Sequence, residues 1–440
     1  MNKLEKESIK NLLIQLMIPS LVTALVTGSY NLVDGIFIGQ SLGIAGTSAN
    51  VYIFMIYTLI YSFSALASEG TASLLTIILG EAKYKKAEEV LSISVLLSLI
   101  LSVIQSILIW GGLDYLLRIF GTPSILYHFI WEFTSVFLIG SPVYFVSHTL
   151  LSCVRAQGAV KEVLYINLIS FVVNTGTGGI FILIFHMGFT GSALSTILAN
   201  LTILVMTCYT YLKTSSNLKL KFFFPDSKTL LKRAKRIINM GLPFFLTTII
   251  SVLLLILYNR VALAYASAYG VAALSIVSSI YRYIISLMNA ITNGIQPIIS
   301  FNYGAQNSVR VQKSLRSSLT VGTLFSIFLF VIIQLYSKEI VSLFNSDSKS
   351  FVAFTSSALR IVMLSLPLQG IINIGTNYFQ YISQPRVSTI LVILRQIIFQ
   401  IPLAVFLPLI FNISGLWDSY YISDLLIFLL IIWLIKKRNQ

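Results

Sequence analysis

Charged residues are scarce in this chain of 440 residues. Only 10% of the residues are Asp, Glu, Lys or Arg, whereas 56% are hydrophobic, and the mean hydropathy is +0.88. Soluble domains contain about 25% charged residues, so this chain has too few of them to cover a surface that faces water. The scarcity excludes an ordinary soluble protein and predicts an integral membrane protein. The hydrophobic runs are long and continuous rather than alternating, which excludes the strands of a transmembrane β-barrel.

Cysteine and histidine are also rare. We expect Cys153 and Cys208 near the cytoplasmic ends of their segments, where a disulfide is not expected. The three histidines, His128, His148 and His186, lack the spacing of a metal site, and the chain contains no Walker A, His-Glu-x-x-His or Gly-x-Ser-x-Gly string. The sequence therefore predicts neither an enzyme nor an ATP-driven pump, and no cofactor or metal site. No filter-like loop of an ion channel stands out either.

Twelve hydrophobic segments are long enough to cross a membrane, which takes about 20 residues per helix. They lie near residues 13–38, 51–79, 91–112, 126–153, 161–185, 189–212, 236–264, 271–300, 318–338, 351–380, 387–410 and 415–436. The predicted fold is therefore an all-α polytopic membrane protein with twelve transmembrane helices. The first segment is too long for a signal peptide and lacks a small-residue cleavage site, so we expect it to be retained.

Lysine and arginine outnumber the acids by 30 to 15. They gather at both termini and in the loops after spans two, four, six, eight and ten, whereas the opposite loops hold only Arg118, Lys338 and Lys349. By the positive-inside rule, both termini lie in the cytoplasm of a multi-pass cell-membrane protein. We therefore interpret the excess charge as a topology signal, with some attraction to anionic lipid headgroups, and expect no nucleic-acid partner.

Several residues recur at one fixed offset in residue number, which we call the repeat offset. The matching pairs are Pro19 and Pro243, Gly70 and Gly294, Gly80 and Gly304, and Gly191 and Gly415; after a three-residue slip, Gln157-Gly158 also matches Gln384-Pro385. The repeat predicts two halves of six helices, residues 1–220 and 221–440, joined by a basic loop at about 213–236. Because six is even, both halves enter the membrane in the same orientation, as two pseudo-symmetric bundles. Such bundles are expected to form a central cleft that opens to each side in turn.

One acid lies in the middle of the first segment, in the string Asn31-Leu-Val-Asp34-Gly-Ile-Phe-Ile-Gly39. Placing a charge there costs roughly 2.5 to 3.5 kcal/mol, so Asp34 is a functional-site hypothesis by default. Burial favours the protonated form of a carboxyl group. A change in hydration could therefore load and release a proton, and an organic cation would compete with that proton. The alternative is a permanently protonated or hydrogen-bonded Asp34 that only pins the first helix to Asn31 or Asn174.

Six short motifs follow one another along the chain. They are Asn31-x-x-Asp34-Gly-Ile-Phe-Ile-Gly39, Gly70-x9-Gly80-Glu81, Arg155-Ala-Gln-Gly158, Gly294-Ile-Gln-Pro-Ile-Ile-Ser-Phe-Asn-Tyr-Gly304-Ala, Arg395-Gln396 leading to Pro402, and Gly415-Leu-Trp417 leading to Asp424. Their order and spacing resemble those of the multidrug and toxic compound extrusion (MATE) transporters over nearly the whole chain. The resemblance implies twelve helices around a V-shaped cleft, and export of amphipathic, often cationic compounds against proton or sodium entry.

The resemblance also implies site residues. Asp34 aligns with the coupling residue of the subgroup that has a first-helix aspartate, and Asn174 and Thr196 match polar positions near it. The fifth span of the family usually reads Asn-x-x-Leu-Asp-Pro, but this chain has Gly178 in place of that second acid. Asp34 is thus expected to couple alone, and a lone carboxylate favours the proton over sodium. The candidates for the substrate or ion site are Asn31, Glu69, Asn174, Thr177 and Thr196.

These observations predict a monomeric, cation-coupled secondary antiporter that exports amphipathic, mainly cationic small molecules by alternating access. The alternative is a flippase for a lipid-linked or amphipathic anionic substrate, because Arg260, Arg282 and Arg360 all lie in the second half. Convergence of these arginines on one cavity would favour the flippase. Asp424 and Arg395 are expected to have structural roles, with Asp424 making a hydrogen bond within the second bundle.

Overall fold

The computed structural model describes residues 2–213, 218, 226–344 and 348–439, and within these residues every element is helical. The helices of the first half are α1 (Asn2–Lys6), α2 (Ile9–Gly80), α3 (Tyr84–Ile119), η1 (Ser124–Leu126), α4 (Tyr127–Ala156), α5 (Val160–Gly178), η2 (Gly179–Ile184) and α6 (Gly188–Lys213). Those of the second half are α7 (Ser227–Gly304), α8 (Ser308–Ser342), α9 (Lys349–Val362), η3 (Met363–Ser365), α10 (Leu366–Tyr381), α11 (Pro385–Ile393), η4 (Leu394–Gln400), α12 (Ile401–Phe411) and α13 (Ile413–Asn439).

Twelve segments of the described chain are long and apolar enough to cross a membrane, which confirms the predicted number. Both α2 and α7 contain two such segments. In α2 the backbone breaks at Gly43, where φ is 61°, so the spans are Ile9–Gly43 and Ala45–Gly80. In α7 the break lies at Ala266 and Ser267. A positive φ ends the run of helical hydrogen bonds, and glycine adopts it without steric cost.

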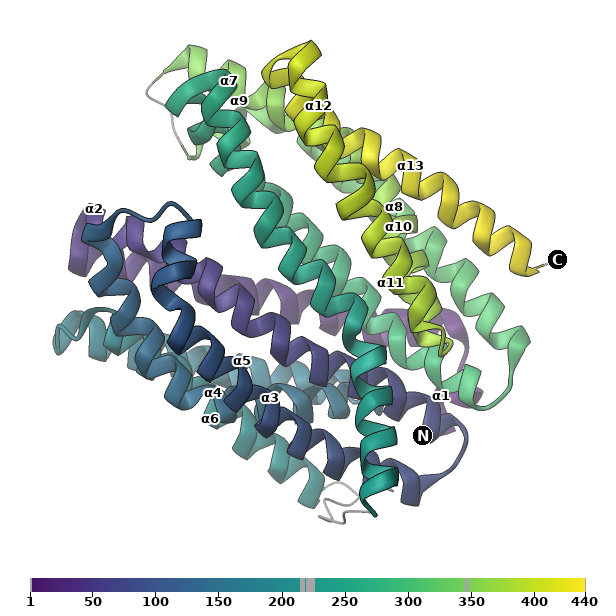
Figure 1. Cartoon of the computed structure of the whole chain (residues 1–440). Helices are drawn as coiled ribbons and strands as arrows, with labels where there is room; N and C mark the ends of the chain where they lie inside the picture. The colour runs from purple at the N-terminus through teal and green to yellow at the C-terminus, as the bar shows by residue number, and fades with distance from the viewer. Residues whose placement is uncertain (1, 214–217, 219–225, 345–347, 440) are drawn as a thin grey trace.

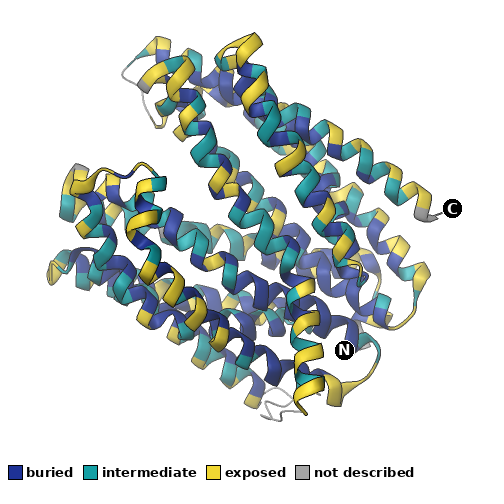
Figure 2. Ribbon diagram, in the orientation of Figure 1, coloured by how far each residue is buried: buried dark blue, intermediate teal, exposed yellow. Residues whose placement is uncertain are grey.

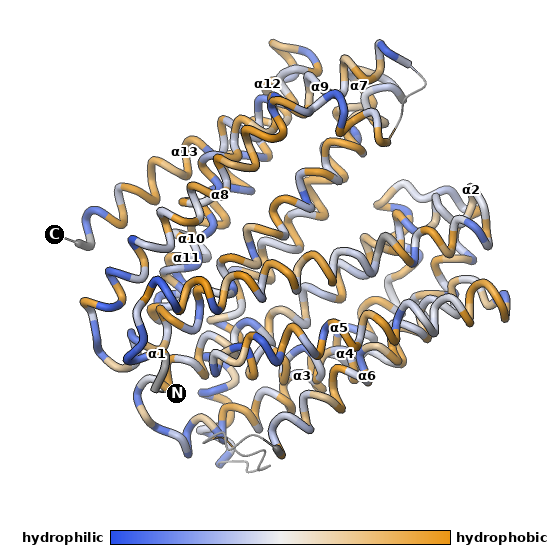
Figure 3. Tube along the Cα trace, turned by 180° about the vertical axis from the view of Figure 1, so that it is seen from behind, coloured by the Kyte–Doolittle hydropathy of each residue, from blue (hydrophilic) through white to orange (hydrophobic). Residues whose placement is uncertain are grey.

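The helices form two bundles, which we call the N lobe (α2–α6) and the C lobe (α7–α13). Within the N lobe α4 packs against α2, α3 and α6, and within the C lobe α10 packs against α8 and α12 against α13. Figure 1 shows the two lobes meeting near the chain termini and diverging away from them. Buried residues concentrate where the helices meet (Figure 2), and hydrophobic residues cover the long helices while hydrophilic ones gather at their ends (Figure 3).

Glycines from the repeat bring the two lobes into backbone contact. A Cβ atom added to Gly80 would lie 2.1 Å from the carbonyl oxygen of Phe301, and one added to Gly304 would lie 2.0 Å from the carbonyl oxygen of Ile77. Ile77 and Phe301 are themselves related by the repeat offset, so the same contact is made twice. Only glycine allows the helix backbones to approach this closely.

A second pair of glycines repeats the pattern further into the molecule. A Cβ on Gly70 would lie 2.9 Å from the Gly241 nitrogen, and a Cβ on Gly294 would lie 3.0 Å from the Met17 Cα atom. Met17 and Gly241 are again separated by the repeat offset. Such reciprocal contacts characterise an interface around a twofold axis, and the two lobes are therefore related by pseudo-twofold symmetry.

Backbone conformation follows the same repeat. Positive φ angles pair at the repeat offset for Gly43 and Ser267, Ala82 and Gln306, and Gly188 and Asn412, and one position further along for Gly158 and Ser383. The turn after the fourth span therefore recurs with a slip of one residue, and the predicted slip of three residues is wrong. The predicted boundary at 220 lies outside the described residues and stays a prediction.

The lobes are joined toward one end only. We call this the basic end; it carries the turns around Ala82, Gly158, Gln306 and Ser383. Among the described residues, the hydrogen bond or ring contact between the lobes that lies farthest from the basic end joins Arg282 and Phe54. The Arg282 guanidinium lies 5.7 Å from the centre of the Phe54 ring.

From that level the contacts continue toward the basic end. The rings of Phe63 and Phe245 meet edge to face at 5.1 Å. Ser73 Oγ then accepts hydrogen bonds from the side-chain amides of Gln296 (2.9 Å) and Gln380 (3.0 Å). The structure is therefore closed at the basic end.

Candidate functional site

Asp34 lies on the first span of α2 and faces α5 and α6 of the N lobe. Its Oδ2 atom accepts a hydrogen bond of 3.4 Å from the Ser192 hydroxyl of α6, whereas its Oδ1 atom is buried and has no hydrogen-bond partner among the described residues. A buried carboxylate oxygen without a donor is unfavourable unless it carries a proton or meets a cation. The geometry therefore suits an acid that exchanges a proton.

Gly178 of α5 lies directly beside this oxygen. A Cβ atom at Gly178 would stand 3.6 Å from Asp34 Oδ1 and 3.5 Å from the Ser195 hydroxyl oxygen. An aspartate at this position would place a second carboxyl group against the first. In this chain the position supplies no oxygen ligand, so Asp34 has no neighbouring acid on α5.

Three predicted site residues lie on the helices that flank Asp34. Asn174 is buried and its Oδ1 atom has no hydrogen-bond partner in the described part of the chain. Thr177 bonds to a backbone carbonyl one turn earlier, and Thr196 donates to the Ser192 carbonyl at 2.9 Å. Within the described chain, none of them is hydrogen-bonded to Asp34. The bonding partner is Ser192, which sequence reasoning missed although it lies one turn before Thr196 on the same helix.

A different residue fastens the first span to α5. The Tyr30 hydroxyl donates to the Asn167 carbonyl at 2.9 Å, and the Tyr30 ring stacks on Phe171 at 5.3 Å. This span therefore has an anchor besides Asp34, which weakens the alternative of a purely structural carboxyl group. The side chain of Asn31 lies outside the described residues, so its proposed role stays a prediction.

Glu69 lies far from Asp34. Asp34 lies about two and a half helical turns before the break at Gly43, which is about 14 Å along the first span at 1.5 Å per residue. Glu69 lies more than six helical turns after Ala45, which is about 36 Å along the second span from the same break. Both Glu69 carboxylate oxygens accept hydrogen bonds of 2.7 Å from Arg155 of α4. Both side chains are largely buried. The structure thus gives Glu69 a counter-ion inside the N lobe.

The three arginines considered for an anionic substrate do not share a contact in the described residues. Arg282 lies beside the Phe54 ring already described and bonds to the Ser279 hydroxyl at 3.0 Å. Arg360 donates from Nε to the Ser337 hydroxyl at 2.6 Å within the C lobe. Arg260 is exposed on α7. Of these three, Arg282 is the one with a contact to the other lobe among the described residues.

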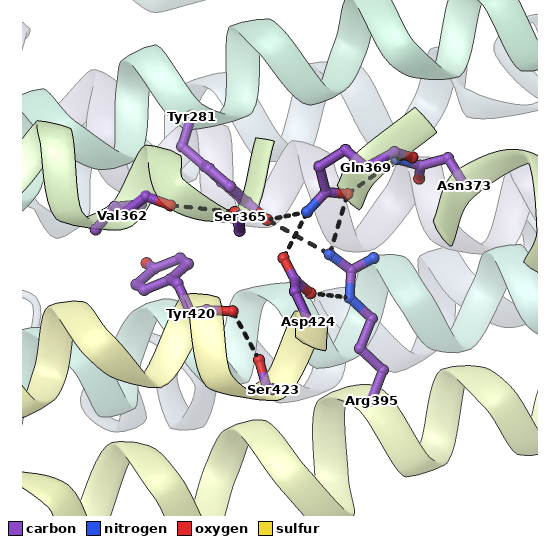
Figure 4. A network of polar contacts seen from close by, with 9 residues as sticks. All are labelled: Tyr281, Val362, Ser365, Gln369, Asn373, Arg395, Tyr420, Ser423 and Asp424. Carbon is purple, nitrogen blue, oxygen red and sulfur yellow. Dashed lines mark hydrogen bonds and ion pairs between the residues drawn. The ribbon is translucent and has the colours of Figure 1, made fainter. Parts of the chain in front are cut away.

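A buried polar network lies in the C lobe (Figure 4). Asp424 of α13 accepts hydrogen bonds from Arg395 Nε at 2.7 Å and from Gln369 Nε2 at 2.5 Å, one on each carboxylate oxygen. Arg395 also donates to Gln369 Oε1 at 3.3 Å and to the Tyr281 hydroxyl at 3.5 Å. The hydrogen bond predicted for Asp424 is present, and its partners are now identified.

A cavity of about 650 Å³ opens at the basic end, where the last turns of α2 and α7 meet α8 and α10. Its walls include Gly80, Lys83, Gly304 and Tyr378. Asp34 does not line it, so this cavity is separate from the candidate site. In the described residues no group of three or more His, Cys, Asp or Glu side chains is arranged to hold a metal ion.

Comparisons with known proteins cover nearly the whole chain. A family model described as MatE matches residues 19–178 and 243–406. The multidrug export protein MepA of Staphylococcus aureus (strain bovine RF122 / ET3-1) is 22% identical over 440 residues, covering 99% of this chain and 96% of that protein. The MepA protein of Staphylococcus haemolyticus (strain JCSC1435) is 23% identical over 443 residues, with coverage of 99% and 95%.

Solved structures share the fold. An outward-facing multidrug resistance MATE family transporter of the MOP superfamily superposes with a TM-score of 0.89 at 23% identity, covering 98% of this chain and 96% of that chain. A MOP superfamily transporter from Pyrococcus furiosus, whose binding pocket is reported to have reversed polarity, gives a TM-score of 0.92 at 22% identity, covering 99% and 97%. These similarities establish the arrangement of the helices.

Proposed function

Because the chain belongs to the MatE family of transporters, we propose that it is a secondary antiporter that exports amphipathic, mainly cationic small molecules in exchange for protons. The observation that carries this proposal is Asp34, a carboxyl group inside the membrane-spanning part with one buried oxygen that lacks a partner in the described residues. The relatives called multidrug export proteins support drug-like substrates.

The proposed coupling ion is the proton. A sodium ion needs several oxygen ligands, and Gly178 supplies no side-chain oxygen beside Asp34. A proton needs only the carboxylate itself. When Asp34 is protonated the site is neutral, and when an organic cation approaches, the ionised form is favoured. Substrate and proton therefore exclude each other, which is the condition for antiport.

The proposed transport cycle rocks the two lobes about their closed end. We propose from the positive-inside rule that the basic end lies in the cytoplasm. The state described here is then closed to the cytoplasm and faces outward. The similarity to a transporter in an outward-facing conformation supports this assignment. The protein is then a monomeric, multi-pass cell-membrane protein with both termini in the cytoplasm.

The flippase alternative is less well supported. It requires several arginines around one anionic headgroup, whereas Arg360 is bonded to Ser337 within the C lobe and Arg282 contacts Phe54 of the N lobe. In the described residues the three arginines share no contact. The transporter with a reversed-polarity pocket shares the fold, so the charge of the substrate needs a direct test. We propose cationic substrates because, in the described N lobe site, Asp34 is an acid without a counter-ion.

Transport in proteoliposomes tests both parts of the proposal. We expect uptake of a fluorescent organic cation driven by an imposed pH gradient in the wild type, and loss of gradient-driven uptake in Asp34→Asn. The matched control is Asp114→Asn, because Asp114 is an exposed aspartate of α3 that accepts a hydrogen bond from Trp131. Replacing the pH gradient with a sodium gradient distinguishes the proton from sodium as the coupling ion. Undiminished uptake by Asp34→Asn would refute the coupling role.

A further inference from the structure

The repeat identifies a counterpart of the Asp34 site in the C lobe. Adding the repeat offset to Asp34 gives Tyr258, and this register is fixed on both sides by Pro19 with Pro243 and by Gly43 with Ser267. The first span of the C lobe carries no acid at this position. A tyrosine occupies the place of the coupling carboxyl group.

The other helices of the counterpart site also follow the repeat. The same offset takes Tyr57 to Tyr281, Ser195 to Ser419, Thr196 to Tyr420, and Asn200 to Asp424. The Tyr420 ring lies 4.8 Å from the ring of Tyr258 and 5.2 Å from that of Tyr281, measured between ring centres. Tyr258 and Tyr420 thus replace the smaller side chains of Asp34 and Thr196, whereas Tyr281 has a tyrosine as its N-lobe counterpart.

Both sites nevertheless contain one acid beside the fifth helix of their lobe. In the N lobe the acid is Asp34, and the fifth helix presents Gly178 to it. In the C lobe the acid is Asp424 of the sixth helix, and the fifth helix presents the guanidinium of Arg395. The N lobe therefore holds an acid without a fixed cation, and the C lobe holds, at a different position of the repeat, an acid with a fixed cation. Figure 4 shows the C-lobe acid with its guanidinium.

Hydrogen bonding separates the two acids further. Each oxygen of Asp424 accepts a bond, and the Gln369 amide that donates one of them also accepts from Asn373 at 3.0 Å and from Arg395. Asp34 keeps a buried oxygen without a partner in the described chain. A buried ion pair is seldom the most stable solution, because apolar residues of similar volume often do as well or better. Stability alone therefore does not explain why the C lobe keeps both charges.

We propose that Asp424 is a latent cation site that the tethered guanidinium of Arg395 keeps permanently occupied. The ligand class of this site is a small monovalent cation that accepts a carboxylate and the Gln369 and Tyr281 oxygens as partners. Its occupation by a side chain leaves one exchangeable site per molecule, in the N lobe. This consequence for the number of coupling ions rests on the proposed function of Asp34, whereas the cation site itself does not.

Chemical rescue tests the site directly. The full-length Arg395→Ala variant, purified in detergent, removes the tethered cation and leaves a space of guanidinium shape beside Asp424. Its melting temperature is measured against added guanidinium chloride at concentrations far below denaturing ones, with tetramethylammonium chloride at equal ionic strength as the control. We expect a saturable rise in melting temperature with guanidinium only, and none in the wild type.

The double variant Arg395→Ala/Asp424→Asn decides whether the carboxylate binds the cation. We expect the saturable rise to disappear in it. An equal rise in the double variant, or no guanidinium-specific rise in Arg395→Ala, would overturn the proposal. If the Arg395→Ala variant does not accumulate, the readout becomes the amount of folded variant obtained when guanidinium is present throughout purification. If guanidinium does not restore this variant while the double variant folds, the result counts against the site. Because no transport is measured, failure here is distinct from failure of Asp34→Asn in proteoliposomes.

Discussion

Replacing Gly80 with alanine should shift the molecule away from the state that is closed at the basic end. The added Cβ would lie 2.1 Å from the Phe301 carbonyl oxygen, whereas real Cβ atoms essentially never come within 3.0 Å of another heavy atom. The obstacle is backbone of the opposite lobe, so no side chain can rotate out of the way. The two helices must instead separate by most of an ångström.

The size of the shift follows from the cost of overpacking. Inserting a methyl group into a close-packed contact costs about 1 to 3 kcal/mol, and this cost applies only to the state in which the lobes touch at Gly80. A difference of that size changes a two-state population roughly 5- to 150-fold. Alanine also favours the helix by up to about 1 kcal/mol over glycine, but that gain is the same in both states.

Pulsed electron paramagnetic resonance between two spin labels measures the shift. Lys161 of the N lobe and Arg386 of the C lobe lie near the basic end, at the starts of α5 and α11, and suit the labels. We expect a longer distance to gain population in Gly80→Ala, and in Gly304→Ala by the same reasoning. Gly111→Ala is the control, since nothing lies within 4 Å of its added Cβ. An unchanged distance distribution in folded Gly80→Ala would refute this account of the closure.

Two further predictions concern the charged groups of the N lobe. Gly178→Asp places a second carboxyl group beside Asp34 and should make transport in proteoliposomes stimulated by sodium, whereas Gly176→Asp on the same helix, where nothing lies within 4 Å, should not. Glu69→Gln leaves the buried Arg155 without its counter-ion and should lower the free energy of unfolding by about 3 to 5 kcal/mol. Thermal unfolding measures this loss, and adding Arg155→Gln should restore stability. An unchanged stability in Glu69→Gln, or no restoration in the double variant, would contradict the stabilising role of the ion pair.

The fold could be predicted from the sequence because its main signals are local or periodic. Long apolar runs give the twelve spans, and the recurrence of Gly70, Gly80, Gly294 and Gly304 gives the two lobes. The reason for the glycines was not visible in the sequence. It lies in reciprocal backbone contacts between helices of opposite halves of the chain, which only the packed structure defines.

The candidate site was predicted in part. Asp34 stood out because an acid is rare in an apolar segment, but its donor Ser192 is 158 residues away and is one of many serines. The sequence makes Glu69 a candidate for the substrate or ion site, because it does not reveal that the counter-ion Arg155 lies beside it on another helix, 86 residues along the chain. Pairings of this kind depend on which helix faces pack together, and hydropathy does not encode that choice.

Closure at the basic end and the proposed coupling at Asp34 involve free energies of similar size. One proton moved across a difference of one pH unit supplies about 1.36 kcal/mol, and a methyl group added at a closing glycine contact costs the closed state about 1 to 3 kcal/mol. If Asp34 alone couples, a single methyl group at Gly80 or Gly304 changes the balance between the two states as much as one to two pH units of driving force. Transport by Gly80→Ala should therefore need a different pH gradient from the wild type for half-maximal flux. Equal gradients would mean that closure at the basic end is not the step that the proton drives.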